Sequence, residues 1–254
     1  MANPPPESFS SIKAILFDVF GTVVDWESGL TRQLKNHADK VQAKDARIVA
    51  KLNQVDWLAF ARDWRKAFWA VATAFPRSQD IDDFDIDEVH KGCLQGLIPK
   101  YGLEDAWTGA QVDEITKFWH YLEGSFSLRI RISEHYIIAP CANGTLRVLI
   151  DMARHADLPW HTIFTSDVLH TFKPSPSFYL RAAHLLRLPP SEILMVAAHD
   201  YDLAAASQVG FHTCYVRRTT EDAGGGHVKV GAEGVEWLVD GFAEIVEGLT
   251  TVRV

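Results

Sequence analysis

The feature that most restricts the possible folds is a series of short apolar segments that alternate with amphipathic ones. The apolar segments are residues 13–17, 136–142, 162–167, 193–200 and 212–218. In the second half of the chain, the segments between them carry apolar residues every three to four positions, which is typical of helices. Strands that alternate with helices predict a parallel sheet covered on both faces. We therefore expect the doubly wound, Rossmann-like α/β class.

A long segment without strand character follows the first predicted strand. Residues 26–124 read as helices, most clearly at 55–75 and 112–124, where apolar and aromatic residues recur with helical spacing. We therefore expect a discontinuous α/β core domain formed by residues 1–25 and 125–254, and an inserted, all-helical cap domain at 26–124.

Composition and charge narrow the class of protein. The 254 residues are 47% hydrophobic and 23% charged, which is ordinary for a globular chain. A net charge of −8 argues against a nucleic-acid partner, because no basic excess exists to neutralise phosphates. The polar, proline-rich start lacks the apolar region of a signal peptide, and no apolar run approaches the roughly 18 residues of a membrane span. We expect a soluble, cytoplasmic protein with no membrane partner.

Three features that can indicate ligand sites have ordinary structural explanations. The three cysteines are scattered, which fits a reducing compartment better than a disulfide or zinc framework, and Cys141 is expected as a small buried residue. The acidic segment at 81–88 lacks the central glycine of a calcium loop. The glycine-rich segment at 223–227 lacks the Lys-Ser/Thr pair of a phosphate loop. No metal site is therefore predicted.

Polar residues follow the predicted strands at the edge where an open parallel sheet binds its ligands. These residues are Asp18, Thr22, Asn143, Lys173, His199 and Asp202. Each alone can be a helix cap, a turn residue or part of a surface loop. Together they place two carboxylates, a lysine, a histidine and two neutral hydrogen-bonding groups at one edge, which predicts an active site.

Four motifs in this order resemble those of the haloacid dehalogenase superfamily of hydrolases. The motifs are FDVFGT, CANG, FKPSP and AAHDYDL. The resemblance extends over nearly the whole chain, including the helical cap, and is closest to the L-2-haloacid dehalogenase (type II) branch. It implies the fold more directly than the substrate, because one fold hosts many activities.

The resemblance implies a role for each core motif residue. Asp18 matches the nucleophile, and Thr22 matches the residue that orients it through a hydrogen bond. Lys173 matches the lysine that steadies the nucleophile, since a nearby cation keeps a carboxylate ionised. Asp202 matches the acid of the fourth motif.

Further residues are assigned to substrate contact by the same resemblance. Asn143 matches the substrate-contacting asparagine of the second motif, and Tyr179 matches a tyrosine near the reacting centre. Arg65, in the cap segment DWRKAFW, matches an arginine that receives the leaving halide. Arg62 lies one turn earlier, but the Trp-Arg pair favours Arg65.

Phe20 bears on the reaction. Phosphatases of this superfamily carry a second aspartate at that position, which protonates the leaving alkoxide, whereas phenylalanine can donate no proton. A halide leaves without protonation. We therefore expect Asp18 to attack carbon of a small, anionic 2-halocarboxylic acid and to form a covalent ester that water hydrolyses, without a cofactor.

Two departures from the dehalogenase pattern leave the leaving group open. Ala142 stands where a serine usually helps to hold the substrate carboxylate. His199 stands where an asparagine is frequent, and it is either a general base for ester hydrolysis or a histidine bonded at a strand end. The Ala-Ala-His…Asp pattern also resembles cis-epoxysuccinate hydrolases. If this chain opened an epoxide, Tyr179 or protonated His199 would be its proton donor.

The alternatives are therefore an epoxide hydrolase acting on a small epoxy-dicarboxylate, a magnesium-dependent phosphatase with Mg²⁺ at Asp18 and Asp202, and a catalytically idle binding module. The intact set of Asp18, Lys173 and Asp202 argues against the idle module. A homodimer formed through the cap is common among similar proteins and is a possible assembly.

Overall fold

The computed structural model describes residues 4–41, 46–74, 84–124, 132–222, 228–231 and 234–252. The acidic segment at 81–88 lies partly outside the described residues, and the glycine-rich segment at 223–227 lies wholly outside them. The chain divides into two compact units, Met1–Asp25 with Gly124–Val254 and Trp26–Glu123. Among the described helices, none combines the length and apolar character that crossing a bilayer requires.

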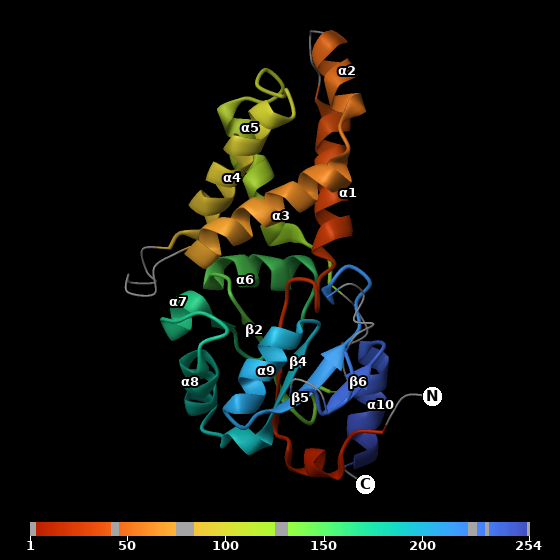
Figure 1. Ribbon diagram of the computed structural model, residues 1–254, viewed down its shortest axis with the longest axis vertical. Helices are drawn as coiled ribbons and strands as arrows, with labels where there is room; N and C mark the ends of the chain where they lie inside the picture. Colours follow the sequence, from red (N-terminus) through yellow and green to blue (C-terminus); the bar gives the residue numbers. More distant parts are fainter. Residues whose placement is uncertain are drawn as a thin grey trace. The chain divides into compact units, whose positions relative to one another are not determined.

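The first unit is built on one parallel sheet, to which the described residues contribute six strands (Figure 1). The strands are β1 (Ala14–Phe17), β2 (Ile137–Ala142), β3 (Phe164–Thr165), β4 (Ile193–Ala197), β5 (His212–Val216) and β6 (Trp237–Val239). Their order is β3-β2-β1-β4-β5-β6, so β1 lies between β2 and β4 and is paired on both edges. The predicted doubly wound α/β class is confirmed.

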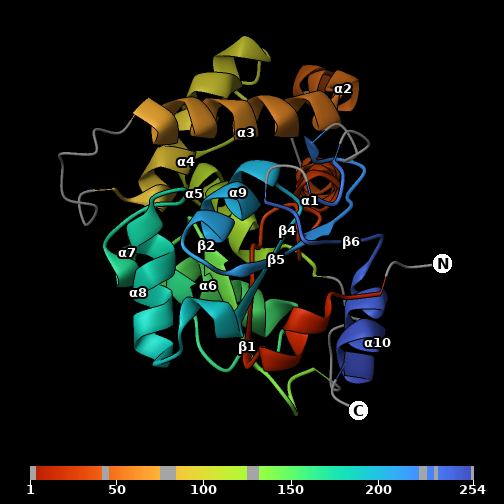
Figure 2. The same cartoon turned by 60° about the horizontal axis from the view of Figure 1, so that its bottom comes forward.

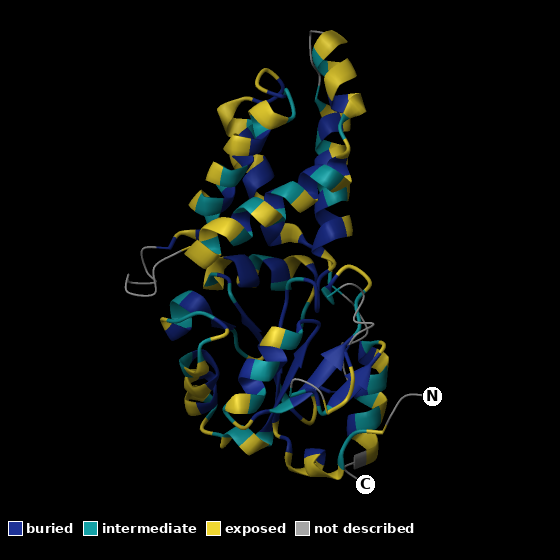
Figure 3. Cartoon of the chain, viewed as in Figure 1, coloured by how far each residue is buried: buried dark blue, intermediate teal, exposed yellow. Residues whose placement is uncertain are grey.

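Both faces of the sheet are buried, which explains why its strands read as continuous apolar runs (Figure 3). On one face, Leu16 and Met195 belong to the same buried cluster as residues of α8 (Pro176–Leu186) and α9 (Asp200–Gln208). On the other face, the Phe17 ring packs edge-on against Phe242 of α10 (Phe242–Val252) at 5.9 Å. In both views α8 and α10 lie on opposite sides of this unit (Figures 1 and 2).

Local sequence signals fix where the helices begin, and they shorten two predicted strands. The predicted strand at 193–200 ends at Ala197, because His199 is the N-cap residue of α9. The predicted strand at 162–167 contains only β3, because Ser166 begins the short helix α7 (Ser166–Leu169). The Thr145 side chain caps α6 (Leu146–His155), as expected for threonine before an amphipathic run.

The second unit contains helices throughout its described residues. They are α1 (Trp26–Lys40), α2 (Ala46–Gln54), α3 (Trp57–Ala74), α4 (Ile86–Lys100), α5 (Gly109–Thr116) and the 3-10 helix η3 (Lys117–Tyr121). The predicted helix at 112–124 is therefore two shorter pieces. Their shared interior is aromatic, because Phe60, Trp64 and Trp119 are almost fully buried.

Truncation of a buried side chain on the central strand β1 should lower the stability of the first unit strongly. Leu16 is fully buried between two neighbouring strands, so Leu16→Ala removes buried methyl groups and leaves a cavity. We expect the free energy of unfolding to fall by about 2–5 kcal/mol in urea titrations. Leu185→Ala is the matched control, because that side chain is 57% exposed, and it should change the value by less than about 0.5 kcal/mol. Equal losses in the two variants would contradict the assigned burial.

Candidate active site

Asp18 follows β1 directly and is held by the turn that comes after it. Its backbone N–H donates to Val196 O at 2.9 Å, which continues the pairing with β4 beyond the end of the strand. Gly21 adopts φ +86°, a left-handed conformation that glycine reaches without steric cost. Thr22 thereby returns to the strand end, and its hydroxyl donates to Asp18 Oδ2 at 2.7 Å and accepts from the Ala198 N–H at 2.9 Å.

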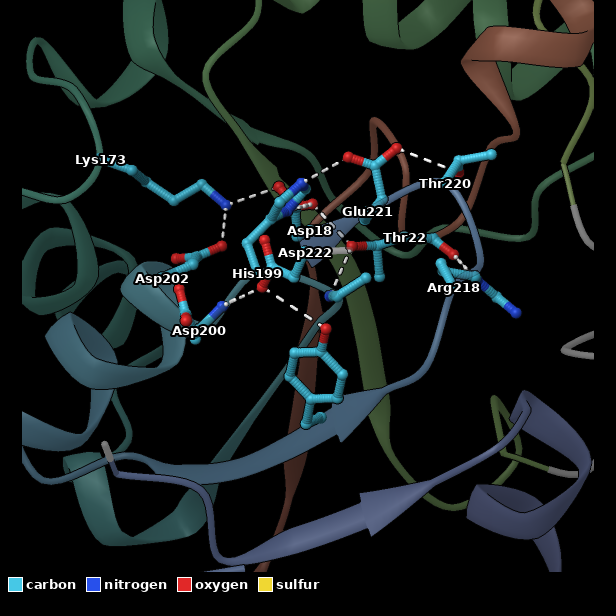
Figure 4. Close-up of polar contacts among 12 residues, drawn as sticks. Asp18, Thr22, Lys173, His199, Asp200, Asp202, Arg218, Thr220, Glu221 and Asp222 are labelled. Carbon is cyan, nitrogen blue, oxygen red and sulfur yellow. Dashed lines mark hydrogen bonds and ion pairs between the residues drawn. The ribbon is translucent and has the colours of Figure 1, made fainter. Parts of the chain in front are cut away.

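Lys173 brings the two predicted carboxylates together (Figure 4). Its ammonium lies 2.8 Å from Asp18 Oδ1 and 2.5 Å from Asp202 Oδ2. All three side chains are buried, so the lysine charge acts on both acids with little screening by water. The structure thus joins residues from the end of β1, from the first turn of α9 and from the loop between α7 and α8.

The predicted residues Asn143 and Tyr179 contact other members of the site. Asn143 spans the backbone of Lys173: its Nδ2 donates to Lys173 O at 3.0 Å, and its Oδ1 accepts from the Lys173 N–H at 2.7 Å. Ser166, which the sequence did not single out, also donates to this oxygen at 3.3 Å. Tyr179 is fully buried, and its hydroxyl donates to Asp202 Oδ1 at 2.5 Å.

His199 connects Asp18 to an acid that sequence reasoning missed. Its Nδ1 lies 3.1 Å from Asp18 Oδ2, and its Nε2 lies 3.0 Å from Glu221 Oε2 (Figure 4). Glu221 lies in the loop after β5, at the same edge of the sheet as the other site residues. Its position after a predicted strand was the available signal, although no motif marked it.

The charges in this cluster determine the protonation of Asp18. Burial alone would raise the pKa of Asp18, but the charge of Lys173 and the hydrogen bond from His199 outweigh it and hold that pKa well below its usual range. Burial would lower the pKa of Lys173, yet Asp18 and Asp202 raise it above its ordinary value. Asp18 is therefore an ionised carboxylate beside a charged ammonium at neutral pH.

The remaining groups keep their protons more firmly than usual. Burial opposes charge on His199, but its hydrogen bonds to Asp18 and Glu221 raise its pKa to about 10. Burial is also the main cause of the raised pKa of Asp202, against the lowering effect of Lys173. Burial raises the pKa of Tyr179 too, so its hydroxyl remains a hydrogen-bond donor. Burial likewise raises the pKa of Cys141, which fits its predicted role as an apolar residue.

Arg65 lies on α3 in the second unit, among aromatic rings. Its guanidinium carbon is 5.3 Å from the ring centroids of Trp26 and Trp69 and 5.8 Å from that of Trp119. Such contacts stabilise a cation and restrict its side chain. Arg62, one turn earlier on α3, instead forms a bidentate ion pair with Glu27, with N–O distances of 2.6 and 3.0 Å.

Comparison with known proteins identifies the family of this arrangement. The family described as haloacid dehalogenase-like hydrolase matches residues 12–210. The (S)-2-haloacid dehalogenase 4A of Burkholderia cepacia is 24% identical over 82% of this chain and 84% of its own. A crystal structure of an L-2-haloacid dehalogenase is 30% identical, with a TM-score of 0.78 over 94% of this chain and 99% of the other.

A second similar structure holds a covalently bound ligand. It is the L-2-haloacid dehalogenase of Xanthobacter autotrophicus with chloropropionic acid covalently bound. Its TM-score is 0.70 at 18% identity, over 93% of this chain and 97% of the other, which demonstrates a shared fold.

The raised pKa of His199 predicts a stability difference that depends on pH. A group whose pKa is raised by folding stabilises the folded state fully below its unfolded value, and this contribution is lost as pH rises through the folded pKa. Relative to His199→Gln, the wild type should therefore lose a few kcal/mol of unfolding free energy between about pH 6.5 and about pH 10. Urea titrations across this range measure the difference. His184→Gln, on the exposed side of α8, is the control and should track the wild type; a constant difference for His199→Gln would contradict the assignment.

Proposed function

We propose that this chain, which belongs to the haloacid dehalogenase-like hydrolases, hydrolyses small (S)-2-halocarboxylic acids. The observation that carries the proposal is the ionised Asp18 carboxylate, paired with Lys173, on a turn where Phe20 replaces a proton-donating acid. Such a carboxylate suits attack on a carbon atom whose leaving group departs without a proton. The similarity to L-2-haloacid dehalogenases supports the same substrate class.

The first step is nucleophilic displacement at carbon 2 of the substrate. A carboxylate oxygen of Asp18 forms the new C–O bond, while the carbon–halogen bond breaks and the halide leaves with the bonding electrons. Lys173 keeps the carboxylate ionised, and Thr22 fixes its rotation through the bond to Oδ2. A covalently bound chloropropionic acid in a relative is consistent with an ester of this kind.

The second step is hydrolysis of the Asp18 ester. Water attacks the ester carbonyl, the product 2-hydroxy acid leaves, and the Asp18 carboxylate is regenerated. His199 is the proton carrier in this step, because its Nδ1 faces the same carboxylate. A protonated His199 cannot accept a proton in the resting enzyme, but esterification removes the negative charge of Asp18 that helps to keep it protonated.

The other site residues support these steps. Asp202 is proposed to hold the ammonium of Lys173, with Tyr179 orienting it, and Asn143 to hold the Lys173 backbone. A direct contact between Asn143 and substrate stays a prediction. The assignment of Arg65 to the leaving halide also stays a prediction, which is compatible with the fixed cationic side chain on α3.

The phosphatase alternative requires magnesium, and the residues present do not fit it. Both oxygens of Asp202 accept hydrogen bonds, from Lys173 and Tyr179, and Asp18 is bonded to Lys173, Thr22 and His199. The Lys173 ammonium thus occupies the space between the two carboxylates where a shared cation would bind. The Phe20 side chain supplies no carboxylate oxygen, whereas an aspartate at this position would add a second acid to the turn.

Epoxide hydrolysis is the second candidate, and one observation favours it. Opening an epoxide leaves an alkoxide on the product, so a proton donor near the nucleophile accelerates the reaction. His199 carries a proton at neutral pH and lies 3.1 Å from Asp18, whereas the Tyr179 hydroxyl is committed to Asp202. His199 is therefore the donor in this alternative, with a small epoxy-dicarboxylate as substrate.

The substrate in either case is a small organic anion. We further propose a reducing, cytoplasmic setting, since Cys93, Cys141 and Cys214 are all described and are free thiols. Assembly as a homodimer stays a prediction that sedimentation of the purified chain can test.

Asp18 should be indispensable for turnover and should carry the covalent intermediate. Asp18→Asn removes the ionised oxygen, so chloride release from (S)-2-chloropropionate should fall by about 10⁴-fold or more. Asp240→Asn, a change of an exposed aspartate, is the control and should retain activity. In a single turnover in ¹⁸O-water, label should enter the Asp18 carboxylate and the product should carry none. Label in the product alone would contradict covalent catalysis.

A substrate panel distinguishes the candidate reactions. We expect chloride release from (S)-2-chloropropionate that is unchanged by EDTA, because the Lys173 ammonium already pairs with both acids. Diol formation from cis-epoxysuccinate without chloride release would favour the epoxide hydrolase. Turnover of p-nitrophenyl phosphate that requires magnesium would overturn attack on carbon.

A further inference from the structure

We propose that Glu221 is a positioning residue that fixes the tautomer of His199, so that His199 Nδ1 accepts a proton from the water that hydrolyses the Asp18 ester. The inference rests on the proposed covalent mechanism and adds a residue to it. It also gives His199 a defined orientation, which the ring nitrogens alone do not determine.

The His199 imidazole lies between two acids. Its two nitrogens face two different acids: Nδ1 lies 3.1 Å from Asp18 Oδ2, and Nε2 lies 3.0 Å from Glu221 Oε2 (Figure 4). Both His199 and Glu221 are more than nine-tenths buried, at 8% and 9% exposure. A carboxylate can only accept, so Glu221 requires the proton on Nε2 and leaves Nδ1 as the nitrogen that exchanges protons beside Asp18.

The Glu221 side chain is packed against the turn that follows Asp18. A Cβ added at Gly21 would collide with the Glu221 carboxylate, so the missing side chain at Gly21 makes room for it. Thr220 donates to Glu221 Oε1 at 3.2 Å. Arg218, from the same loop, donates to Thr22 O at 2.9 Å and ties the loop to the turn. Glu221 is thus held relative to both Asp18 and His199.

The titratable groups that face His199 come from three parts of the core. Asp18 reaches it from the end of β1, and Glu221 reaches it from the loop after β5. The Tyr201 ring of α9 lies 5.6 Å from the imidazole, centroid to centroid. Lys173 acts on it through Asp18, whose charge it partly neutralises. Of these groups, Asp18 alone changes its charge during the proposed reaction.

The proton balance then closes over one turnover. When Asp18 becomes an ester, His199 loses the Nδ1 proton to solvent. It keeps the proton on Nε2, which is hydrogen-bonded to Glu221. Nδ1 takes a proton from the attacking water, whose oxygen bonds to the ester carbon, and returns it to the product oxygen as the C–O bond to Asp18 breaks. The carboxylic acid so formed on Asp18 gives its proton to Nδ1, which restores the resting state.

Two substitutions separate the charge of Glu221 from its hydrogen bond. Glu221→Gln keeps an oxygen that can accept from Nε2 but loses the negative charge. The acidic limb of the kcat profile should therefore move to lower pH by about one unit, with turnover largely retained. Glu221→Met keeps the volume and removes the acceptor, so kcat for halide release should fall by about 100-fold.

Pre-steady-state halide release distinguishes positioning from a general structural role. In Glu221→Met, a rapid burst of one halide per active site should persist, and the ester should accumulate on Asp18 in intact-mass spectra, because displacement does not use His199. Glu236→Gln is the matched control, because Glu236 forms another His–Glu pair, with His212 at 2.7 Å, in which Asp18 takes no part. The pH profile and the halide burst of this variant should match those of the wild type.

The measurements distinguish a failure of the role of Glu221 from a failure of the proposed function. A wild type that releases halide, with Glu221 variants whose pH profile and turnover match it, would overturn the role of Glu221 and leave the function standing. Burst and turnover that fall together in Glu221→Met, at an unchanged melting temperature, would also overturn it. A wild type that releases no halide and forms no adduct would remove the proposed function itself.

Discussion

The structure of the site depends on the contact of one buried ammonium with two buried carboxylates. Lys173 lies 2.8 Å from Asp18 and 2.5 Å from Asp202. Two acids cannot both remain ionised without water unless a cation lies between them, and removing one partner of such a buried set typically costs about 3–5 kcal/mol. The same contact therefore stabilises the buried Asp18 and keeps it ionised, which is the state that the proposed attack on carbon requires. This explains why the backbone of Lys173 is fixed on both sides by Asn143.

The sheet supplies the rigidity that this contact needs. β1 is paired on both edges, and the Asp18 N–H extends the pairing to β4, so backbone hydrogen bonds alone fix the position of the Asp18 main chain. His199, as the N-cap residue of α9, and Asp202, in the first turn of that helix, come from one short segment at the end of β4. Asp18, His199 and Asp202 are thus positioned by rigid elements, and the proposed mechanism needs such fixed geometry for efficient catalysis.

The sequence predicts this arrangement in part, and physical reasons explain the limit. Asp18, Lys173 and Asp202 could be grouped because the carboxyl ends of parallel strands meet at one edge and because their motifs have a fixed order. The end of β4 was misplaced, since the apolar pattern continues through Ala198 while the backbone already turns into a helix. Glu221 was missed although it follows a predicted strand, because no motif marks it, it lies in a loop without periodicity, and its contact with His199 is determined by tertiary structure. The three-residue strand β6 was missed because it is too short to show alternation.

Phe20 and His199 together determine where a proton donor lies in this site, and this placement suits the proposed attack on carbon. An acid at the position of Phe20 would lie on the nucleophile's own turn and protonate a departing oxygen. Among the described residues that contact Asp18, we propose that His199 is the group that changes its protonation once Asp18 is esterified, because it faces the carboxylate oxygen that Thr22 also holds. A proton carrier at the carboxylate assists the breakdown of an ester on Asp18 more directly than the departure of the first leaving group. In the proposed mechanism Phe20 and His199 are therefore complementary: Phe20 offers no proton where a departing halide needs none, and His199 carries the proton that hydrolysis of the ester requires.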